Sequence, residues 1–308
     1  MRRLASTLGK AIGNPAKLAE YLAVKGRLHW MSDRTFIRFL YKGYFGHYPD
    51  LDNPKTYNEK LQWLKLNDRN PLYTQLVDKY RVRDYIKNKI GGEYLIPLLG
   101  VWDTPDQIDF SQLPDQFVLK CNHDTGSVIV CRDKAQFDEK KARDKLQRCL
   151  ANGTYWYTRE WPYKNVQPCI IAEQYMEDNT FHELRDYKFF CFDGIPRAMY
   201  IATGRLNPDT PTSFDFFDMD FNHLDIRQAH PNAVNTPEKP NNFEKMKELA
   251  GILSEGFSHV RVDFYEINNR VYFGEMTFYH MGGVYPFVPD SWDLEMGSWL
   301  HLPNKGSN

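Results

Sequence analysis

The sequence HVRVDFYEINNRVYFGEMTF, from His259 to Phe278, carries the pattern that decides the fold. Apolar residues alternate with polar ones on both sides of Asn268-Asn269, which predicts two strands joined by a tight turn. Each arm contains one carboxylate, Asp263 in the first and Glu275 in the second. A half-exposed hairpin whose solvent face is charged is an equally simple interpretation of this segment alone.

The length of the turn determines whether the two carboxylates face each other. A three-residue loop over 268–270 places Asp263 opposite Glu275, and the same register places Arg261 opposite Thr277. A two-residue turn puts the two acids on opposite faces instead. Facing carboxylates repel each other unless a cation lies between them. Oxygen ligands with a nearby arginine suit Mg²⁺ together with phosphate.

The composition indicates a chain with a sizeable core and no general affinity for nucleic acid. Its 308 residues are 42% hydrophobic and carry a formal net charge of −1, which predicts two or three lobes and gives no basic signature for nucleic-acid binding. The five cysteines are odd in number and show no C-x-x-C spacing, so neither a zinc site nor a disulfide framework is predicted. A cytoplasmic location is the simplest expectation.

The first thirty residues are basic and rich in leucine. They contain one acid, Glu20, against six cations: Arg2, Arg3, Lys10, Lys17, Lys25 and Arg27. Such a segment predicts either a peripheral contact with anionic lipid at the inner face of the membrane or a basic helix packed on the body of the protein. Gly13-Asn14-Pro15 interrupts any long amphipathic helix, and this favours packing.

The pattern along the chain is helical first and rich in strands later. Thr56 and Glu59 have capping-box spacing, which predicts the start of a helix. A second helix is predicted from Asp78 until Gly91-Gly92 ends it. From Gln116 onward, short apolar segments separated by polar loops indicate strands.

Two predicted strand ends carry groups that suit a nucleoside triphosphate. Lys120 ends one strand, and a short loop leads to Gly126-Ser127 and the next strand. Backbone N–H groups of 122–127 would cover phosphate oxygens while the lysine supplies a point charge, although no P-loop motif is present and a solvated lysine is the commoner case. The segment IIAEQYM, Ile170 to Met176, is an apolar strand whose polar end can present backbone groups to an adenine edge, unless it is a core strand reaching the surface. Lys188, in a third predicted strand, is likewise a candidate for phosphate binding that could instead be an ordinary strand residue.

Five segments occur in one order that resembles a known family. They are DKYRVRDYI from Asp78, FVLKCNHDTGS from Phe117, IIAEQYM from Ile170, LRDYKFFCFDG from Leu184 and RVDFYEINNRVYFGEMTF from Arg261. Together they resemble the TupA-like (teichuronopeptide-biosynthesis-like) ATP-grasp family of bacterial surface-polysaccharide clusters, over about residues 32–290. The resemblance implies an α+β ATP-grasp fold in which two α+β lobes clamp ATP. It implies a helical N-terminal region at 1–115, a small lobe at 116–180 and a large lobe with the metal-binding hairpin at 181–308.

The resemblance also implies roles for individual residues. The matching positions are Lys79, Lys120 and Lys188 for the phosphates, Glu173, Gln174 and Met176 for the adenine, Asp263 and Glu275 for Mg²⁺, and Arg261 for the acyl-phosphate transition state. Thr277 stands where many ATP-grasp ligases have Asn, so the resemblance implies a second Mg²⁺ that is held more loosely or through water. Asp178 and Glu183 both remain candidates for the acid that binds ribose.

The implied activity is that of an ATP-dependent carboxylate–amine ligase, which forms an acyl phosphate and then an amide. The implied partners are a polysaccharide or sugar-carboxylate acceptor, such as a uronic acid, and an amine donor. The aromatic residues of 155–163, with Trp292 and Trp299, offer flat faces for sugar rings. A nucleotide-sugar glycosyltransferase is the alternative, because Asp218 and Asp220 have D-x-D spacing. A nucleotide-binding module without catalysis is a third interpretation.

Overall fold

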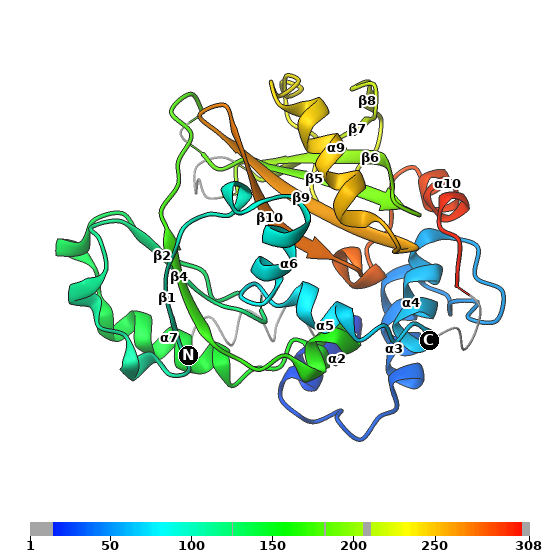
Figure 1. The fold of residues 1–308 in the computed structure, drawn as a ribbon. Coiled ribbons are helices and arrows are strands. Elements are labelled where there is room, and N and C mark those ends of the chain that lie inside the picture. Colours follow the sequence, from blue (N-terminus) through cyan, green and yellow to red (C-terminus); the bar gives the residue numbers. More distant parts are fainter. Residues whose placement is uncertain (1–14, 125, 182, 206–210, 304–308) are drawn as a thin grey trace.

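The chain folds around two antiparallel sheets. The computed structural model describes residues 15–303 except 125, 182 and 206–210, and this part of the chain forms nine α-helices and ten strands. One sheet has four strands and the other has six, and helices flank both (Figure 1). The arrangement is α+β, as predicted.

The smaller sheet has the strand order β1-β4-β2-β3. Its strands are β1 (Leu98–Trp102), β2 (Phe117–Cys121), β3 (Ile129–Cys131) and β4 (Ile170–Gln174). The surrounding helices are α7 (Glu139–Leu150) and the 3-10 helices η2 (Pro105–Gln107), η3 (Phe110–Gln112) and η4 (Lys134–Gln136). Alternate residues of β2 and β4 point into a core shared with α7, in which Phe117, Ile170 and Leu146 are fully buried.

Strand β1 lies within the region 1–115, for which the sequence predicts helices. Its pairs with β4 run from Leu98–Glu173 to Trp102–Ile170, so this segment belongs to the smaller sheet. A short apolar run has neither helical nor alternating period, and only its pairing with β4 makes it a strand. The helical region therefore ends before residue 98.

The larger sheet has the strand order β10-β9-β5-β6-β7-β8. Its strands are β5 (Asp186–Phe192), β6 (Ile195–Thr203), β7 (Ser213–Asp218), β8 (His223–Leu224), β9 (His259–Ile267) and β10 (Arg270–Thr277). Helix α9 (Phe243–Ser254) packs against β5, β6 and β9. Tyr57 contacts Phe190 and Phe192 of β5, with ring centroids 6.3 and 6.1 Å apart. Every residue of β5 is consequently buried.

The remaining helices surround the larger sheet. They are α2 (Pro15–Val24), α3 (Asp33–Phe45), α4 (Tyr57–Asn67), α5 (Leu72–Val77), α6 (Val82–Lys89), α8 (Tyr155–Thr158) and α10 (Ser291–Trp299), with the 3-10 helices η1 (Gly92–Tyr94), η5 (Trp161–Asn165) and η6 (His280–Gly283). Thr56 and Glu59 form the predicted capping box at the start of α4. Asp78 accepts hydrogen bonds from the N–H groups of Tyr80 and Arg81, just before α6 begins.

The basic N-terminal segment is described only from residue 15 onward. Ala16, Ala19 and Ala23 of α2 pack against Phe36 and Leu40 of α3, which agrees with the favoured interpretation of a helix packed on the body. The predicted lipid-contacting residues Arg2, Arg3 and Lys10 lie outside the described residues. Within the described residues, no helix combines the length and apolar character needed to cross a bilayer.

Candidate active site

The β9–β10 hairpin brings its two acids face to face by a route that the sequence analysis did not anticipate. The turn has two residues, Asn268 and Asn269, both with positive φ (50° and 63°), and not three. Such a turn alone would separate the acids. A β-bulge at Gly274 adds one residue to β10 and restores the register, so Glu275 pairs with Asp263. Of the two turn lengths that the sequence leaves open, the two-residue turn forms, and the bulge nevertheless gives the facing pair expected of the three-residue loop.

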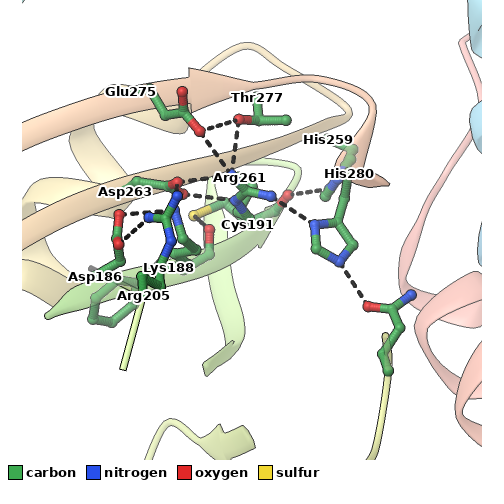
Figure 2. Close-up of polar contacts among 12 residues, drawn as sticks. Asp186, Lys188, Cys191, Arg205, His259, Arg261, Asp263, Glu275, Thr277 and His280 are labelled. Carbon is green, nitrogen blue, oxygen red and sulfur yellow. Dashed lines mark hydrogen bonds and ion pairs between the residues drawn. The ribbon is translucent and has the colours of Figure 1, made fainter. Parts of the chain in front are cut away.

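The cation between the two acids is the side chain of Arg261 (Figure 2). Its Nε donates to Asp263 Oδ1 at 2.7 Å, and one terminal nitrogen donates to Asp263 Oδ2 at 2.7 Å. The same terminal nitrogen donates to Glu275 Oε1 at 3.0 Å and to Thr277 Oγ1 at 3.1 Å. A planar guanidinium is suited to this fork of contacts, because its donors lie in fixed directions.

Further opposite charges continue across the same face of the sheet. Lys188, on β5 directly beside Asp263, ion-pairs with Asp263 and with Asp186, the latter at 3.0 Å. Arg205 pairs with the other oxygen of Asp186. Burial alone would lower the pKa of Lys188, but these two acids raise it above its ordinary value. Paired in this way, the buried charges remain ionised.

The two facing carboxylates have different environments. Asp263 is buried, and burial raises its pKa even though Arg261 and Lys188 oppose the shift. Burial also opposes ionisation of Glu275, but Lys188, Arg261 and Lys79 outweigh it and hold its pKa below the ordinary range. The side chain of Glu275 is 36% exposed. Glu275 is therefore an ionised carboxylate that is open to the cleft.

The donor set on this face fits Mg²⁺. Asp263 and Glu275 supply carboxylate oxygens, and Thr277 adds a hydroxyl oxygen beside Glu275. Mg²⁺ typically takes one or two protein carboxylates and completes its shell with water and phosphate oxygens. Among the described residues, the donors to Glu275 reach only its Oε1. These residues would hold the ion jointly with the phosphates of ATP.

His280 holds Arg261 from the other side. A terminal nitrogen of Arg261 donates to His280 Nδ1 at 2.6 Å, and His280 Nε2 lies 2.7 Å from Gln228 Oε1. Burial and the charge of Arg261 lower the pKa of His280 far below its ordinary value. The ring is thus neutral, with its proton on Nε2, and Gln228 is fixed in turn by a 2.9 Å bond to the carbonyl of Tyr285.

Two of the predicted phosphate-binding lysines, Lys120 on β2 and Lys79 just before α6, line the same cleft. Lys120 Nζ lies 2.6 Å from Glu173 Oε2, and Arg83 contacts the other oxygen of Glu173 at 3.3 Å. These three residues and Lys79 line a pocket whose opposite wall is Phe273 and neighbouring residues of the hairpin. The pocket therefore lies between the two sheets.

The loop that joins β2 to β3 is shaped by its own side chains. Lys79 Nζ donates to the carbonyl of Asp124 at 2.5 Å, which fixes this loop against the segment before α6. The hydroxyl of Ser127 accepts from the N–H of Cys121 at 2.7 Å and contacts Asp124 Oδ1. Gly126 has open space where a side chain would project. The structure thus brings Lys79 and Lys120 to this loop, while the hydroxyl of Ser127 is used within it.

The predicted adenine hinge connects the two sheets. Gln174 ends β4, and its N–H donates to the carbonyl of Pro97 at 3.0 Å. Met176 packs beside Ile267 at the end of β9. Asp178 then accepts from the N–H of Asn268 at 2.7 Å, at the tip of the hairpin.

The two candidate ribose-binding acids, Asp178 and Glu183, both accept hydrogen bonds from other groups of the protein. Asp178 also accepts from the N–H groups of Thr180 and Phe181. Glu183 contacts Arg185 at 2.9 Å and the N–H of Gly204 at 2.9 Å. The contacts do not distinguish between the two acids.

Several residues of the site carry no clear signal in the sequence. Asp186 lies two residues before Lys188 on one strand, so alternation could have placed both on one face. Arg83, Arg205 and Gln228 come from loops and a helix distant in sequence, and only the fold brings them to the cleft.

A comparison with protein families gives a match over most of the chain. Residues 59–301 match the sequence model of the family described as TupA-like ATPgrasp. No curated protein matches the chain.

Several solved structures are similar to the chain at low identity. A D-alanine–D-alanine ligase from Helicobacter pylori is 15% identical over 80% of this chain and 69% of its own, with a TM-score of 0.43. The Bacillus anthracis enzyme complexed with ATP is 13% identical over 66% of this chain and 55% of its own, with a TM-score of 0.40. The D-cycloserine synthetase DcsG is 16% identical over 68% and 64%, with a TM-score of 0.40. The chain thus spans between half and about two thirds of the length of these proteins.

Proposed function

The chain belongs to the TupA-like ATP-grasp family and is therefore an ATP-dependent ligase, and we propose that it joins an amine to the carboxylate of a uronic acid in a bacterial surface polysaccharide. The observation that carries the proposal is the facing pair Asp263 and Glu275 with Arg261 between them. Transfer of a phosphoryl group to a carboxylate needs such an arrangement, because it brings several negative charges together.

The charge balance of the cleft supports this chemistry. The described residues that line the pocket between the sheets or form the ion pairs on the hairpin face comprise six cations and four carboxylates, a surplus of two positive charges within this set. The cations are Lys79, Arg83, Lys120, Lys188, Arg205 and Arg261, and the acids are Glu173, Asp186, Asp263 and Glu275. Such a surplus favours a polyanion such as ATP.

The residues divide the reaction between the two sheets. Lys120 of β2 and Lys79, which lies just before α6, bind phosphate oxygens, and Lys188 lies on the opposite wall. Mg²⁺, when bound by Asp263 and Glu275, neutralises charge on the phosphates. Arg261 is held by His280 so that its guanidinium can stabilise the negative oxygens of the acyl-phosphate transition state. Closure of the sheets keeps water from the acyl phosphate before the amine attacks.

The proposed substrate class rests on the family resemblance. The resemblance to enzymes of polysaccharide clusters favours a sugar carboxylate as acceptor, with an amino acid or other amine as donor. We further propose that basic residues of the N-terminal segment meet anionic lipid at the inner face of the membrane, while α2 itself packs on the body. The family match favours a ligase over the glycosyltransferase alternative, and Asp218 of the D-x-D motif closes a turn by accepting from the N–H groups of Asp220 and Asn222.

A coupled assay tests the proposal. The enzyme is incubated with ATP, MgCl₂, glucuronate or galacturonate, and a mixture of the twenty amino acids. We expect ADP and phosphate only when both a uronate and an amine are present, with the amide detected by mass spectrometry. Release of UDP from UDP-glucuronate, or ADP formation that requires no carboxylate, would overturn it.

A further inference from the structure

The loop between α7 and β4 is held near the site at two points, Thr154 and Thr158. On one side, Thr154 Oγ1 donates to the carbonyl of His123 at 2.6 Å, within the loop that follows β2. On the other side, Lys65 Nζ donates to the carbonyl of Thr158 at 2.8 Å and to that of Gly282 at 2.6 Å. Gly282 belongs to η6, the turn that follows the catalytic hairpin. The loop therefore bridges the phosphate-binding side of the cleft and the hairpin.

Glu160 projects from this loop toward η6. Thr158 Oγ1 donates to Glu160 Oε1 at 2.5 Å. The same oxygen lies 3.6 Å from the position that a Cβ on Gly282 would occupy. The side chain is partly exposed, and among the described residues no hydrogen bond or ion pair reaches its Oε2. One carboxylate oxygen is thus anchored, and the other is left for a ligand.

Glu160 lies within electrostatic range of charged groups on both the helical region and the hairpin. They come from three elements: Lys65 from α4, Arg261 from β9 and Glu275 from β10. Burial raises the pKa of Glu160, although Lys65 and the hydroxyl of Thr158 oppose the shift. Tyr163, from η5, has Glu160, Glu275 and Arg261 as neighbours as well. The loop face that carries Glu160 therefore looks toward the hairpin.

We propose that Glu160 forms the binding site for the amine donor and accepts the proton that the donor must lose before it attacks. The inference rests on the proposed ligase function and adds the residue that recognises the second substrate. Aliphatic amines are ammonium ions at neutral pH, so the donor arrives as a cation and a carboxylate suits it. An ammonium has no lone pair, so attack requires a base within hydrogen-bond reach.

The proposed reaction between the amine and the acyl phosphate balances in atoms and charge without any further reactant. Glu160 takes one proton from the ammonium, and the free amine attacks the acyl carbon. The C–N bond forms, the bond from the acyl carbon to the phosphate oxygen breaks, and phosphate leaves with the electron pair. The nitrogen passes its second proton to the leaving phosphate, and Glu160 later releases its proton to solvent. The products are the amide, HPO₄²⁻ and H⁺.

Hydroxylamine separates the two halves of the reaction. It is neutral at pH 7 and traps an acyl phosphate as a hydroxamate without losing a proton beforehand. The variants are Glu160→Gln, which keeps the shape and can still accept from Thr158, and Glu238→Gln, which changes an exposed acid in the loop before α9. Each is assayed with ATP, glucuronate and either hydroxylamine or the amino-acid mixture, and its stability is measured by urea denaturation.

We expect Glu160→Gln to form hydroxamate within about threefold of the parent rate and to form amide about 100-fold more slowly, which is the usual contribution of a general base. Its amide rate should rise about tenfold per pH unit as the free amine increases, and the parent rate should rise less. Glu238→Gln should match the parent in both assays.

The other possible results distinguish failure of the amine site from failure of the ligase function. Equal loss of both products in a folded Glu160→Gln protein, or no loss of either, would overturn the amine site. Hydroxamate without any amide from the parent enzyme would also overturn it. Absence of both products from the parent enzyme would instead refute the ligase function on which the inference rests.

Discussion

Asp263 is buried between two cations, and this changes what its removal should do. From the sequence alone, loss of either facing acid would only relieve repulsion and leave the fold intact. In the structure, Asp263→Asn leaves Arg261 and Lys188 without their shared partner, and breaking a buried ion pair costs about 3–5 kcal/mol. Glu275→Gln should cost less than about 1 kcal/mol, because that side chain is a third exposed.

Both variants should lose turnover, since both acids are expected to hold Mg²⁺. Urea denaturation and ADP release would measure the two effects separately. Similar stabilities for the two variants would contradict the unequal burial of the acids, and near-normal activity in either would contradict the metal assignment.

Arg261 should matter more for chemistry than for ATP binding. Arg261→Lys keeps the charge but loses the fork that joins Asp263, Glu275 and Thr277, and it loses the contact with His280. We expect kcat to fall by at least about 100-fold, or roughly 2.7 kcal/mol of transition-state stabilisation, with ATP Kd changed only a few fold. Rapid-quench kinetics and titration calorimetry would show this. A collapse in ATP affinity at an unchanged saturated rate would make Arg261 a binding residue.

At the scale of elements, the register of the hairpin depends on Gly274. A Cβ at this position would lie 3.0 Å from the carbonyl oxygen of Asp263 and 3.3 Å from Tyr265 Cε2, which is tight against backbone. Gly274→Ala should therefore destabilise the protein by about 1–3 kcal/mol and lower kcat, because it strains the bulge that aligns Glu275.

Gly251→Ala provides the matched control for this prediction. Gly251 lies in α9, and a Cβ there would meet its nearest atoms at 3.6 and 3.7 Å. This change should raise stability by about 0.5–1 kcal/mol through helix propensity and leave activity unchanged. If both glycine variants behave alike in thermal unfolding and in ADP release, the bulge has no special role.

The sequence could predict what depends on local pattern. The capping box at Thr56 follows from spacing, and the family follows from ordered motifs. The bulge could not be predicted, because the local sequence around a glycine in a strand does not show whether that glycine pairs with a residue of the next strand or is the additional residue of a bulge. Strand β1 and the contact from His280 to Arg261 could not be predicted either, since each is made by partners distant in the chain.

At the scale of the whole molecule, buried histidines should make stability depend on pH. His259 and His280 are neutral in the fold, with burial lowering the pKa of His259 to about 3 and that of His280 far below its ordinary value. The unfolded chain binds these protons near pH 6.5, so it gains protons first as pH falls. The stabilisation is complete above pH 6.5 and is lost below it, at about 1.4 kcal/mol per pH unit for each histidine.

Urea denaturation between pH 8 and pH 5 would test this slope. Replacing His259 by Asn should reduce the slope by about half, whereas replacing His47, which is exposed, should not change it. A free energy of unfolding that stays constant from pH 6.5 to pH 5 would contradict the neutral state of the two rings.

The contact between Asp178 and Asn268 has a mechanical consequence. It fastens the strand that leaves the smaller sheet to the tip of the hairpin, at the end of the cleft assigned to adenine. The loop after β2, at the phosphate end, is held by different bonds, which come from Lys79 and Thr154. The two ends of the cleft are thus closed by separate sets of hydrogen bonds. Opening the adenine end requires the bond between Asp178 and Asn268 to break, whereas opening the phosphate end requires the bonds to Lys79 and Thr154 to break.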